Sequence, residues 1–431
     1  MRDINWPNET IIPMETVPIK FGLGATEELP YELKRLGGRR VLLVTDRGLT
    51  EVGLVDRVQR ILEGDDIRVR VYDGTHVEPT DKSVADAAAF ASEERPDAFV
   101  ALGGGSVIDT AKAMNLCAVH PAPLTDYLNK PIGQGRPVPG PLKPLVAIPT
   151  TAGTGSESTP VLALDLLDLK VKTGISHRYL RPTLALIDPL NTLSMPPEVT
   201  AASGFDVLCH AIESFTARPY NARPRPGSPA ERPGYIGSNP ISDLWSEKAI
   251  ELAGTSLRRA VLNGHDVEAR TAMLLASTAA GIGFGNAGVH IPHAMGYPVA
   301  GMVRDYLPPG YTAVKEPLVP HGISCILNAP AAFRFTAAAC PERQARAARL
   351  LGACTEGLSL MDAAMALSGV LIALMRDLGL PSGLRALGYS EPDVPALADG
   401  ALKQQRLLSC SPRAVGREDM QRLFLEAMSY W

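Results

Sequence analysis

The chain lacks several features that would assign it to a particular class of protein. Its six cysteines form no Cys-x-x-Cys pair, so we expect reduced core thiols rather than a cysteine-based redox or metal motif. The 42 lysines and arginines nearly balance the 46 aspartates and glutamates, which leaves a net charge of −4 and no general attraction to nucleic acid. No internal repeat is evident. Residues 1–20 resemble neither a signal peptide nor an Arg-rich amphipathic leader, so the expected location is cytoplasmic.

Charge is also missing from one long internal segment. Between Thr271 and Val303 there is no Asp, Glu, Lys or Arg. About 20 apolar residues can span a bilayer, but this segment holds six glycines, two prolines and two histidines. We therefore predict a buried helix that ends in a metal-lined turn, and no membrane span.

The pattern of apolar residues differs between the two halves of the chain. The first half alternates short apolar strands with helical stretches, which predicts a doubly wound, Rossmann-like parallel sheet in an α/β domain over residues 1–190. Long Ala- and Leu-rich stretches then predict an all-helical domain over residues 191–431. The predicted strands are Val41–Thr45, Arg68–Tyr72, Phe99–Leu102, Leu145–Pro149 and Thr183–Ile187, and predicted helices include Pro240–Leu262, Val267–Ala280 and Glu342–Leu351.

Three elements of the first half are suited to a dinucleotide. An apolar strand runs into Gly103, Gly104 and Gly105, and a helix opens at Ser106. Glycines there let backbone amides approach a pyrophosphate at the helix N-terminus. Asp46 ends another predicted strand, where its carboxylate could accept hydrogen bonds from a ribose. The third element is a loop rich in hydroxyl groups and glycine, with Thr150, Thr151, Thr154 and Ser156.

Four residues of the second half form a candidate site for one divalent metal. Asp206 and His210 are four apart in a helical stretch, so one face carries both side chains. His293 and His321 follow in a region poor in charge, where a metal would satisfy several buried imidazoles at once. A carboxylate with imidazoles suits ferrous iron or zinc and leaves room for a substrate oxygen.

Taken together, the motifs resemble the iron-dependent (group III) alcohol dehydrogenase family. The elements that carry the resemblance are Gly-Gly-Gly-Ser-x-x-Asp at 103–109, Pro-Thr-Thr-x-Gly-Thr-Gly-Ser-Glu at 149–157, Ile187-Asp188-Pro189, Asp206-x-x-x-His210 and Pro320-His321-Gly322. The resemblance implies a dehydroquinate synthase-like fold, NAD as cofactor with NADP as the alternative, and Fe²⁺ as metal with Zn²⁺ as the alternative. It also implies a homo-oligomer, a dimer or larger, and adds Asp109 and Lys172 to the cofactor-binding residues.

One departure from the family pattern concerns the histidines. Many members carry His-x-x-x-His-Pro, whose first histidine binds metal and whose second lies near the nicotinamide. The best match here is His293-Ala-Met-Gly-Tyr297-Pro298, which makes His293 the ligand and places Tyr297 in the catalytic site. Aligning His290 as the ligand would lose the match to the proline. His290 is then either a group that supports the metal site or a satisfied core histidine.

Three longer stretches, at 204–210, 237–243 and 281–290, resemble the hydroxyacid-oxoacid transhydrogenase branch of the family. This implies hydride transfer from a hydroxyacid such as 4-hydroxybutyrate to an oxoacid such as 2-oxoglutarate through retained NAD. The alternatives are an ordinary NAD(P)-dependent alcohol dehydrogenase or aldehyde reductase with exchangeable cofactor, and a non-catalytic NAD- and metal-binding homologue. A carboxylate substrate needs a cation, and two Pro-rich insertions, residues 218–235 and 304–320, offer Arg218, Arg223, Arg225, Arg304 and Lys315.

Overall fold

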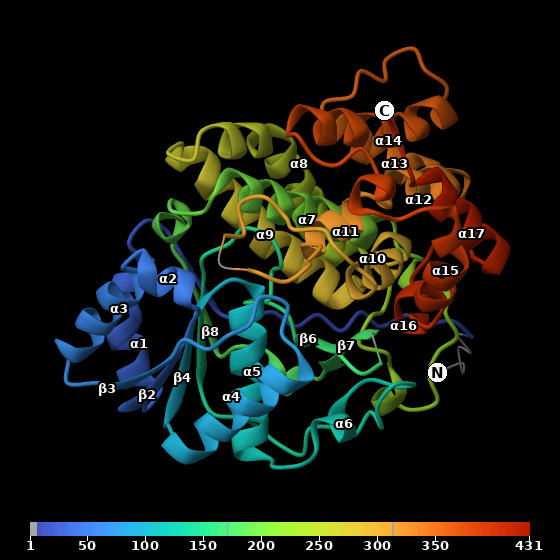
Figure 1. Ribbon diagram of the computed structural model, residues 1–431. Helices are drawn as coiled ribbons and strands as arrows, with labels where there is room; N and C mark the ends of the chain where they lie inside the picture. The colour runs from blue at the N-terminus through green and yellow to red at the C-terminus, as the bar shows by residue number, and fades with distance from the viewer. Residues whose placement is uncertain (1–6, 170, 313) are drawn as a thin grey trace, which may run out of the picture.

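The computed structural model describes residues 7–169, 171–312 and 314–431. In these residues a six-stranded parallel sheet with the order β1-β8-β5-β4-β2-β3 forms the first half, and a separate antiparallel hairpin joins β6 to β7 (Figure 1). The strands are β1 (Ile19–Phe21), β2 (Arg40–Val44), β3 (Arg68–Tyr72), β4 (Ala98–Gly103), β5 (Leu145–Pro149), β6 (Val161–Leu166), β7 (Val171–Ser176) and β8 (Leu184–Ile187).

Helices cover both faces of this sheet, as the doubly wound prediction requires. The helices of the first half are α1 (Leu29–Arg35), α2 (Arg47–Glu51), α3 (Leu54–Glu63), α4 (Asp81–Glu94), α5 (Gly105–Val119) and α6 (Leu124–Tyr127). In β4, Val100 packs with α1 and α3, whereas Ala101 packs with α4 and α5. Alternate residues of a strand point to opposite faces, so a strand buried on both faces is apolar throughout.

The predicted strands match the observed ones closely, but two features were missed. The strand β1 has only three residues, too few for a pattern. The β6–β7 hairpin was not predicted because its first strand, Val-Leu-Ala-Leu-Asp-Leu, is rich in residues with little strand preference. This hairpin matters because it carries Asp165 and Lys172 to the site described below.

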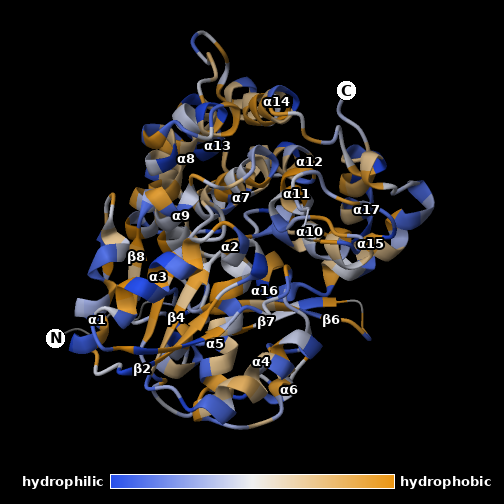
Figure 2. Cartoon of the chain, turned by 60° about the vertical axis from the view of Figure 1, so that its left-hand side comes forward, coloured by the Kyte–Doolittle hydropathy of each residue, from blue (hydrophilic) through white to orange (hydrophobic). Residues whose placement is uncertain are grey.

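In the described residues of the second half every named element is a helix, and a large hydrophobic core lies among these helices. Figure 2 shows hydrophobic and hydrophilic residues mixed along their ribbons. Three long helices, α7 to α9, pack against one another at its centre. The helices are α7 (Pro197–Thr216), α8 (Pro240–Leu262), α9 (Val267–Ala287), α10 (Ile291–Gly301), α11 (His321–Ile326), α12 (Ala329–Thr336), α13 (Pro341–Leu350), α14 (Leu360–Asp377), α15 (Val394–Leu402), α16 (Gln405–Leu408) and α17 (Arg417–Glu426). The last strand ends at Ile187, but the domain boundary near residue 190 stays a prediction.

The segment without charge forms two buried helices, α9 and α10, which meet at a bend of 104°. In the described parts of the chain no single helix is long and apolar enough to cross a membrane, and this pair meets the criteria only when joined. The bend falls at Gly288, whose φ of +95° is a left-handed conformation that favours glycine.

The two halves approach each other most closely through glycine. A Cβ on Gly281 of α9 would lie 2.2 Å from the Ser158 hydroxyl, and a Cβ on Gly155 would lie 2.6 Å from the Gly281 Cα. Gly155 also has a φ of +59°. The hydroxyl-rich loop after β5 therefore rests directly on α9, which brings the nucleotide-binding motifs of the sheet beside the helical half.

Candidate active site

The four predicted metal ligands meet in the helical half. Asp206 and His210 project from α7, His293 from α10, and His321 from the first residue of α11. One potential ligand atom of each lies within 4.8 Å of the other three. Three of the residues are buried, and His321 is partly exposed toward the cleft.

Several atoms of this cluster are buried without a hydrogen-bond partner. They are Asp206 Oδ1, His210 Nδ1 and His293 Nε2. Leaving buried polar atoms unpaired costs free energy, and a cation would satisfy all three at once. The residues therefore fit a divalent metal on the chemistry of the donor set.

The protonation states of the cluster also favour a cation. Burial lowers the pKa of His321 to about 3 and that of His210 well below its ordinary value, so both imidazoles are neutral and keep lone pairs for a metal. Burial raises the pKa of Asp206 to about 7, because no positive charge of the chain balances it well enough. A metal ion would supply that charge.

Glu213 belongs to the site although the sequence analysis did not single it out. His293 Nδ1 donates a 2.6 Å hydrogen bond to Glu213 Oε1, which leaves Nε2 as the free lone pair that faces the cluster. Burial opposes the charged form of His293, but the nearby Glu213 carboxylate prevails and raises its pKa. Positions 206, 210 and 213 follow the i, i+4, i+7 spacing of one helix face, which was the available signal.

His290 lies outside the cluster and plays a different part. Its Nε2 lies 3.1 Å from the Thr216 hydroxyl, and its backbone amide donates to Glu213 Oε2 at 2.6 Å. The structure thus places His293, and not His290, among the potential ligands. The aromatic ring of Phe284 stacks on His210 with 4.0 Å between centroids and closes one side of the cluster.

The glycines of the predicted nucleotide loop lie against the hydroxyl-rich loop. Thr150 N donates to Gly103 O at 3.1 Å. A Cβ on Gly104 would lie 3.1 Å from the Thr151 side chain, and one on Gly105 would lie 2.5 Å from that of Thr154. Only glycine permits this packing, which leaves the first amides of α5 facing the cleft.

Two predicted cofactor residues have their polar groups occupied by the chain. Asp109 accepts from the Ser156 hydroxyl and, at 2.9 Å, from Ala163 N of β6. The fully buried Lys112 donates to Ser156 Oγ at 2.7 Å and to Asp109 Oδ1 at 3.3 Å. In this structure Asp109 and Ser156 hold α5, the loop and the hairpin together.

Asp46 follows β2, the neighbour of β4 in the sheet, so it lies at the same edge as Gly103. Its carboxylate caps α2 by accepting from Leu49 N at 3.1 Å, and it is only partly buried. The position is compatible with a ribose acceptor at the carboxyl edge of the sheet.

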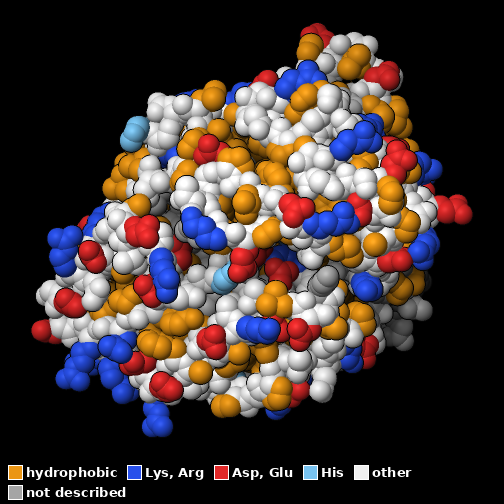
Figure 3. All heavy atoms as spheres, in the orientation of Figure 1, with side chains coloured by type: hydrophobic (Ala, Val, Ile, Leu, Met, Phe, Trp, Pro, Cys, Tyr) orange, Lys and Arg blue, Asp and Glu red, His pale blue; other side chains and the backbone are white. Residues whose placement is uncertain are grey.

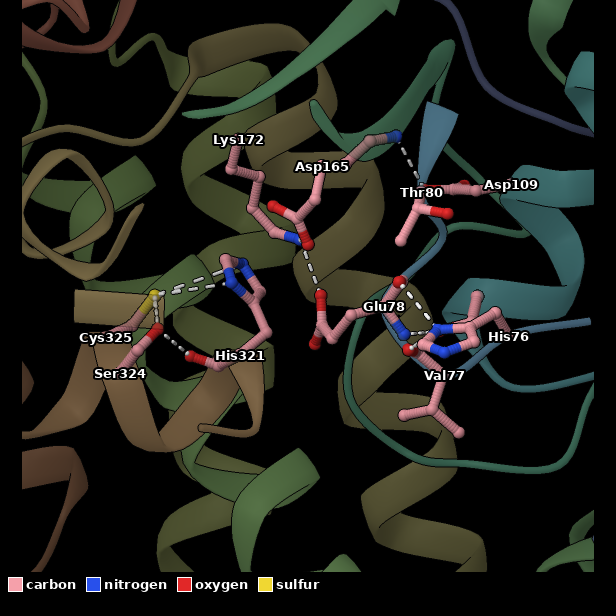
Figure 4. A network of polar contacts seen from close by, with 12 residues as sticks. His76, Val77, Glu78, Thr80, Asp109, Asp165, Lys172, His321, Ser324 and Cys325 are labelled. Atoms are coloured by element: carbon pink, nitrogen blue, oxygen red, sulfur yellow. Dashed lines mark hydrogen bonds and ion pairs between the residues drawn. The ribbon is translucent and has the colours of Figure 1, made fainter. Parts of the chain in front are cut away.

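Lys172 lies in a buried ion network beside the metal cluster (Figure 4). Its ammonium group is 2.5 Å from Glu78 Oε2 and 3.2 Å from Asp165 Oδ2. Burial opposes this charge, but the two carboxylates prevail and raise the pKa of Lys172. Glu78, whose φ is +56°, lies between Lys172 and His321, and the charge of Lys172 lowers its pKa despite burial. The network thus connects the hairpin to a metal-binding element.

The site opens through two connected cavities. The inner one, about 120 Å³, is lined by three of the ligand histidines, by residues of the nucleotide loops and by Lys172 and Tyr297. The outer one, about 700 Å³, shares Glu78, Lys172 and Tyr297 and leads outward between the hairpin and α10. Figure 3 shows this face hollowed between the two halves, with acidic and basic side chains around the hollow. Predicted cofactor-binding residues and potential metal ligands therefore face one cavity.

The cations of the Pro-rich insertions do not line the inner cavity, contrary to our expectation of a carboxylate clamp. Arg304 lines the outer cavity but forms an ion pair with Asp393. The Arg223 guanidinium donates to backbone carbonyl groups of Tyr235 and Ser409. The remaining three, Arg218, Arg225 and Lys315, are exposed.

Comparison with known proteins finds relatives that match this chain over nearly its whole length. The family described as "Iron-containing alcohol dehydrogenase" matches residues 17–189, and "Fe-containing alcohol dehydrogenase family, C-terminal" matches residues 234–428. The mitochondrial hydroxyacid-oxoacid transhydrogenase of Xenopus tropicalis is 49% identical over 98% of this chain and 92% of its own length. The human protein of that name is 48% identical over 96% and 89%.

Solved structures agree in fold. A 1,3-propanediol oxidoreductase superimposes with a TM-score of 0.85 at 32% identity, covering 97% of this chain and all of that one. A sulfoacetaldehyde reductase from Bifidobacterium kashiwanohense, solved with NAD⁺, gives 0.79 at 26% identity, covering 97% and 99%.

The expected cytoplasmic location is wrong on this comparison, because the transhydrogenase relatives are named as mitochondrial. The prediction rested on the composition of residues 1–20, which does not by itself decide the compartment of the protein.

Proposed function

Because this chain belongs to the iron-containing alcohol dehydrogenase family, we propose that it transfers hydride between a small hydroxyacid and an oxoacid through a bound nicotinamide. The observation that carries the proposal is that a cluster of four potential metal ligands contributes its three histidines to the same cavity as the nucleotide loops. The long identity with named transhydrogenases supports the choice of substrates.

We propose that Asp206, His210, His293 and His321 hold one divalent metal, Fe²⁺ or alternatively Zn²⁺. A cation bound there would supply Lewis-acid stabilisation of negative charge on the substrate oxygen. The chain's own contribution is to orient the ligands. Glu213 fixes the tautomer of His293, and Phe284 excludes water from one side of His210.

The cofactor in this proposal is NAD, with NADP as the alternative. The N-terminus of α5 and Gly103–Gly105 would receive its phosphates, and Asp46 a ribose hydroxyl. Lys172 faces the inner cavity with its charge held by Glu78 and Asp165, which places a fixed donor near the sugar or the substrate.

Tyr297 is the candidate proton-holding group of the cavity. Its ring centroid lies 6.0 Å from that of His321, and it occupies the position of the second histidine of the family pattern. Burial raises the pKa of Tyr297, so its hydroxyl stays protonated at neutral pH and can donate a hydrogen bond to a substrate oxygen.

In the proposed reaction 4-hydroxybutyrate becomes succinate semialdehyde while 2-oxoglutarate becomes 2-hydroxyglutarate. Hydride leaves the hydroxyl-bearing carbon of the first and reaches the carbonyl carbon of the second, so no external NAD is consumed. An ordinary alcohol dehydrogenase would instead release reduced cofactor after each oxidation.

The test uses purified enzyme freed of external NAD and 4-hydroxybutyrate labelled with deuterium at the hydroxyl-bearing carbon. We expect label at C2 of 2-hydroxyglutarate, undiluted when unlabelled NADH is added. If label reaches the product only when excess NAD is supplied, or if 1-butanol reacts equally well, the enzyme is an ordinary dehydrogenase. A chain that binds metal and NAD but turns over neither substrate would be the non-catalytic homologue.

We also propose a homo-oligomer, a dimer or larger. The strand β1 is at the edge of the sheet and exposes Ile19 (38%), Phe21 (38%) and, just beyond it, Leu23 (60%). An apolar edge strand readily pairs with a second copy. Light scattering of the wild type and of Phe21→Asp measures this, and a monomeric wild type would contradict it.

A further inference from the structure

Arg406, on the short helix α16, brings a positive charge to the inner cavity. It lines that cavity together with His210, His293 and His321, and its side chain is partly exposed to it. Burial opposes the charge of this guanidinium, and the neighbours that favour it and raise its pKa are Tyr235, Tyr297 and Cys410, with no carboxylate among them. An arginine turned into an enclosed cavity without a counter-ion is suited to an anionic ligand.

The other charges of the cavity are already paired within the chain. Lys172 is held by Glu78 and Asp165. Asp109 is paired with Lys112. These groups are therefore not free to bind a charged substrate, and Arg406 is the cation that remains among the described residues of the cavity lining.

The guanidinium is held in place by the first Pro-rich insertion. It lies over the ring of Tyr235, 4.4 Å from the centroid. Arg223 in turn donates to Tyr235 O at 3.1 Å and to Ser409 O at 3.2 Å, which ties the insertion to the segment that carries Arg406. A Cβ on Gly288 would lie 2.8 Å from the Tyr235 side chain, so the bend after α9 must be glycine for this platform to fit.

An apolar wall separates Arg406 from the metal cluster. Tyr235, Phe284, Val289 and Tyr297 belong to one hydrophobic cluster and all line the inner cavity. Phe284 stacks on His210, and Tyr297 lies near His321. The lining of the cavity therefore combines three potential metal ligands, a set of apolar side chains and the cation of Arg406, which Tyr235 connects to the apolar set.

We propose that Arg406 binds the carboxylate of the substrate and that this one arginine serves both half-reactions. The proposal rests on the hydroxyacid–oxoacid function proposed above. In 4-hydroxybutyrate and in 2-oxoglutarate the carbon that exchanges hydride is three carbon–carbon bonds from a carboxylate carbon. A single cation at a fixed position therefore anchors both molecules with the reacting carbon in the same place, and the methylene groups lie along the apolar wall.

The test compares a charged and a neutral substrate of equal length, 4-hydroxybutyrate and 4-hydroxybutyramide. In Arg406→Met, which keeps an apolar side chain on Tyr235, we expect kcat/KM for the acid to fall by about 100-fold or more, mainly through KM. The amide should change by less than about threefold. Arg406→Lys keeps the charge but loses the paired hydrogen bonds, so it should fall between wild type and Arg406→Met for the acid.

The matched control is Arg304→Met, which removes a cation of the outer cavity that is already paired with Asp393. It should leave the preference for the acid unchanged. Metal content and NAD binding of every variant check that the site is intact. Equal losses for acid and amide in Arg406→Met, or no preference for the acid in wild type, would overturn the proposal. If the acid is preferred but label passes only through external NAD, the transhydrogenase function fails while the role of Arg406 stands.

Discussion

Two buried polar clusters border the same cleft and are built in opposite ways. In the network of Lys172, each charged group has a partner of opposite charge from the chain, namely Glu78 or Asp165. In the cluster of Asp206 and three histidines, key atoms have no partner at all. Paired charges fix the shape of a site, whereas unpaired buried polar atoms are satisfied only when a ligand from outside the chain binds them.

The same distinction between paired and unpaired groups applies to the other charged side chains of the cleft. Asp109 and Ser156 both accept hydrogen bonds from Lys112 and so belong with the groups that fix the shape of the site, while their predicted contact with the cofactor stays a prediction. Arg406 was not expected anywhere, yet its lack of a counter-ion places it with the ligand-accepting groups. The variants below test this contrast, beginning with the largest expected effect.

Removing any one metal ligand should abolish turnover. We expect Asp206→Ala, His210→Ala, His293→Ala and His321→Ala each to lose roughly 1,000-fold or more in kcat and most of the bound metal, since three ligands make a weaker site. Metal analysis and the labelled-substrate assay measure both. His290→Ala is the control and should keep its metal. Full occupancy in His293→Ala with loss in His290→Ala would reverse the assignment.

Breaking the paired network should destabilise the fold even though no metal is involved. Lys172→Met leaves the Glu78 and Asp165 carboxylates without their counter-ion, at a cost of about 3 kcal/mol in the free energy of unfolding, the low end for buried pairs because both acids are partly exposed. Denaturant unfolding measures it. Lys34→Met removes an exposed partner of Asp65 and should cost less than about 1 kcal/mol. Equal costs would show that the network is not a structural element.

Neutralising Glu213 should weaken metal binding while leaving all four ligands in place. In Glu213→Gln the His293 ring loses the charged acceptor that fixes its tautomer, and we expect about 10- to 100-fold weaker binding. Competition with a chelator of known affinity measures the change. Unchanged affinity would mean that the backbone of α10 alone orients His293.

Metal affinity should fall as the pH decreases below about 7. In the metal-free protein the pKa of Asp206 is about 7 and that of His293 is raised, so both bind protons in this range and must lose them to bind a metal. Affinity should therefore be higher at pH 8 than at pH 6, and it should decrease by about tenfold or more per pH unit below the pKa of Asp206. Because the pKa values of His210 and His321 are low, protons do not compete with the metal for these two imidazoles between pH 6 and pH 8. Titrations at pH 8 and pH 6 that give the same affinity would refute the charge argument.

The smallest expected effect concerns Asp46. We expect Asp46→Asn to narrow the preference for NAD over NADP by a few-fold, because a carboxylate repels a 2′-phosphate and an amide does not. The asparagine retains the cap of α2, whereas Asp46→Gly removes it at a cost of a few tenths of a kcal/mol. The ratio of kcat/KM for the two cofactors measures the change. An unaltered ratio in both variants would remove Asp46 from the cofactor site.

Sequence alone determined the fold class, the family and the residue types of the metal site, because these depend on local patterns. Apolar runs such as Phe99–Leu102 predict buried strands, and the spacing of Asp206 and His210 predicts one helix face. The hairpin that carries Lys172 was missed because its first strand is rich in residues with little strand preference.

Tertiary structure alone decided which side chains meet. His293 Nε2 joins the cluster, whereas His290 faces Thr216. These two histidines are only three residues apart, and the bend between α9 and α10 sets the direction of each side chain. Arg406 faces the inner cavity and the arginines of the insertions do not, and this difference depends on contacts such as that between Arg223 and Ser409, 186 residues apart. Such contacts are set by packing across the whole molecule, and no local pattern in the sequence encodes them.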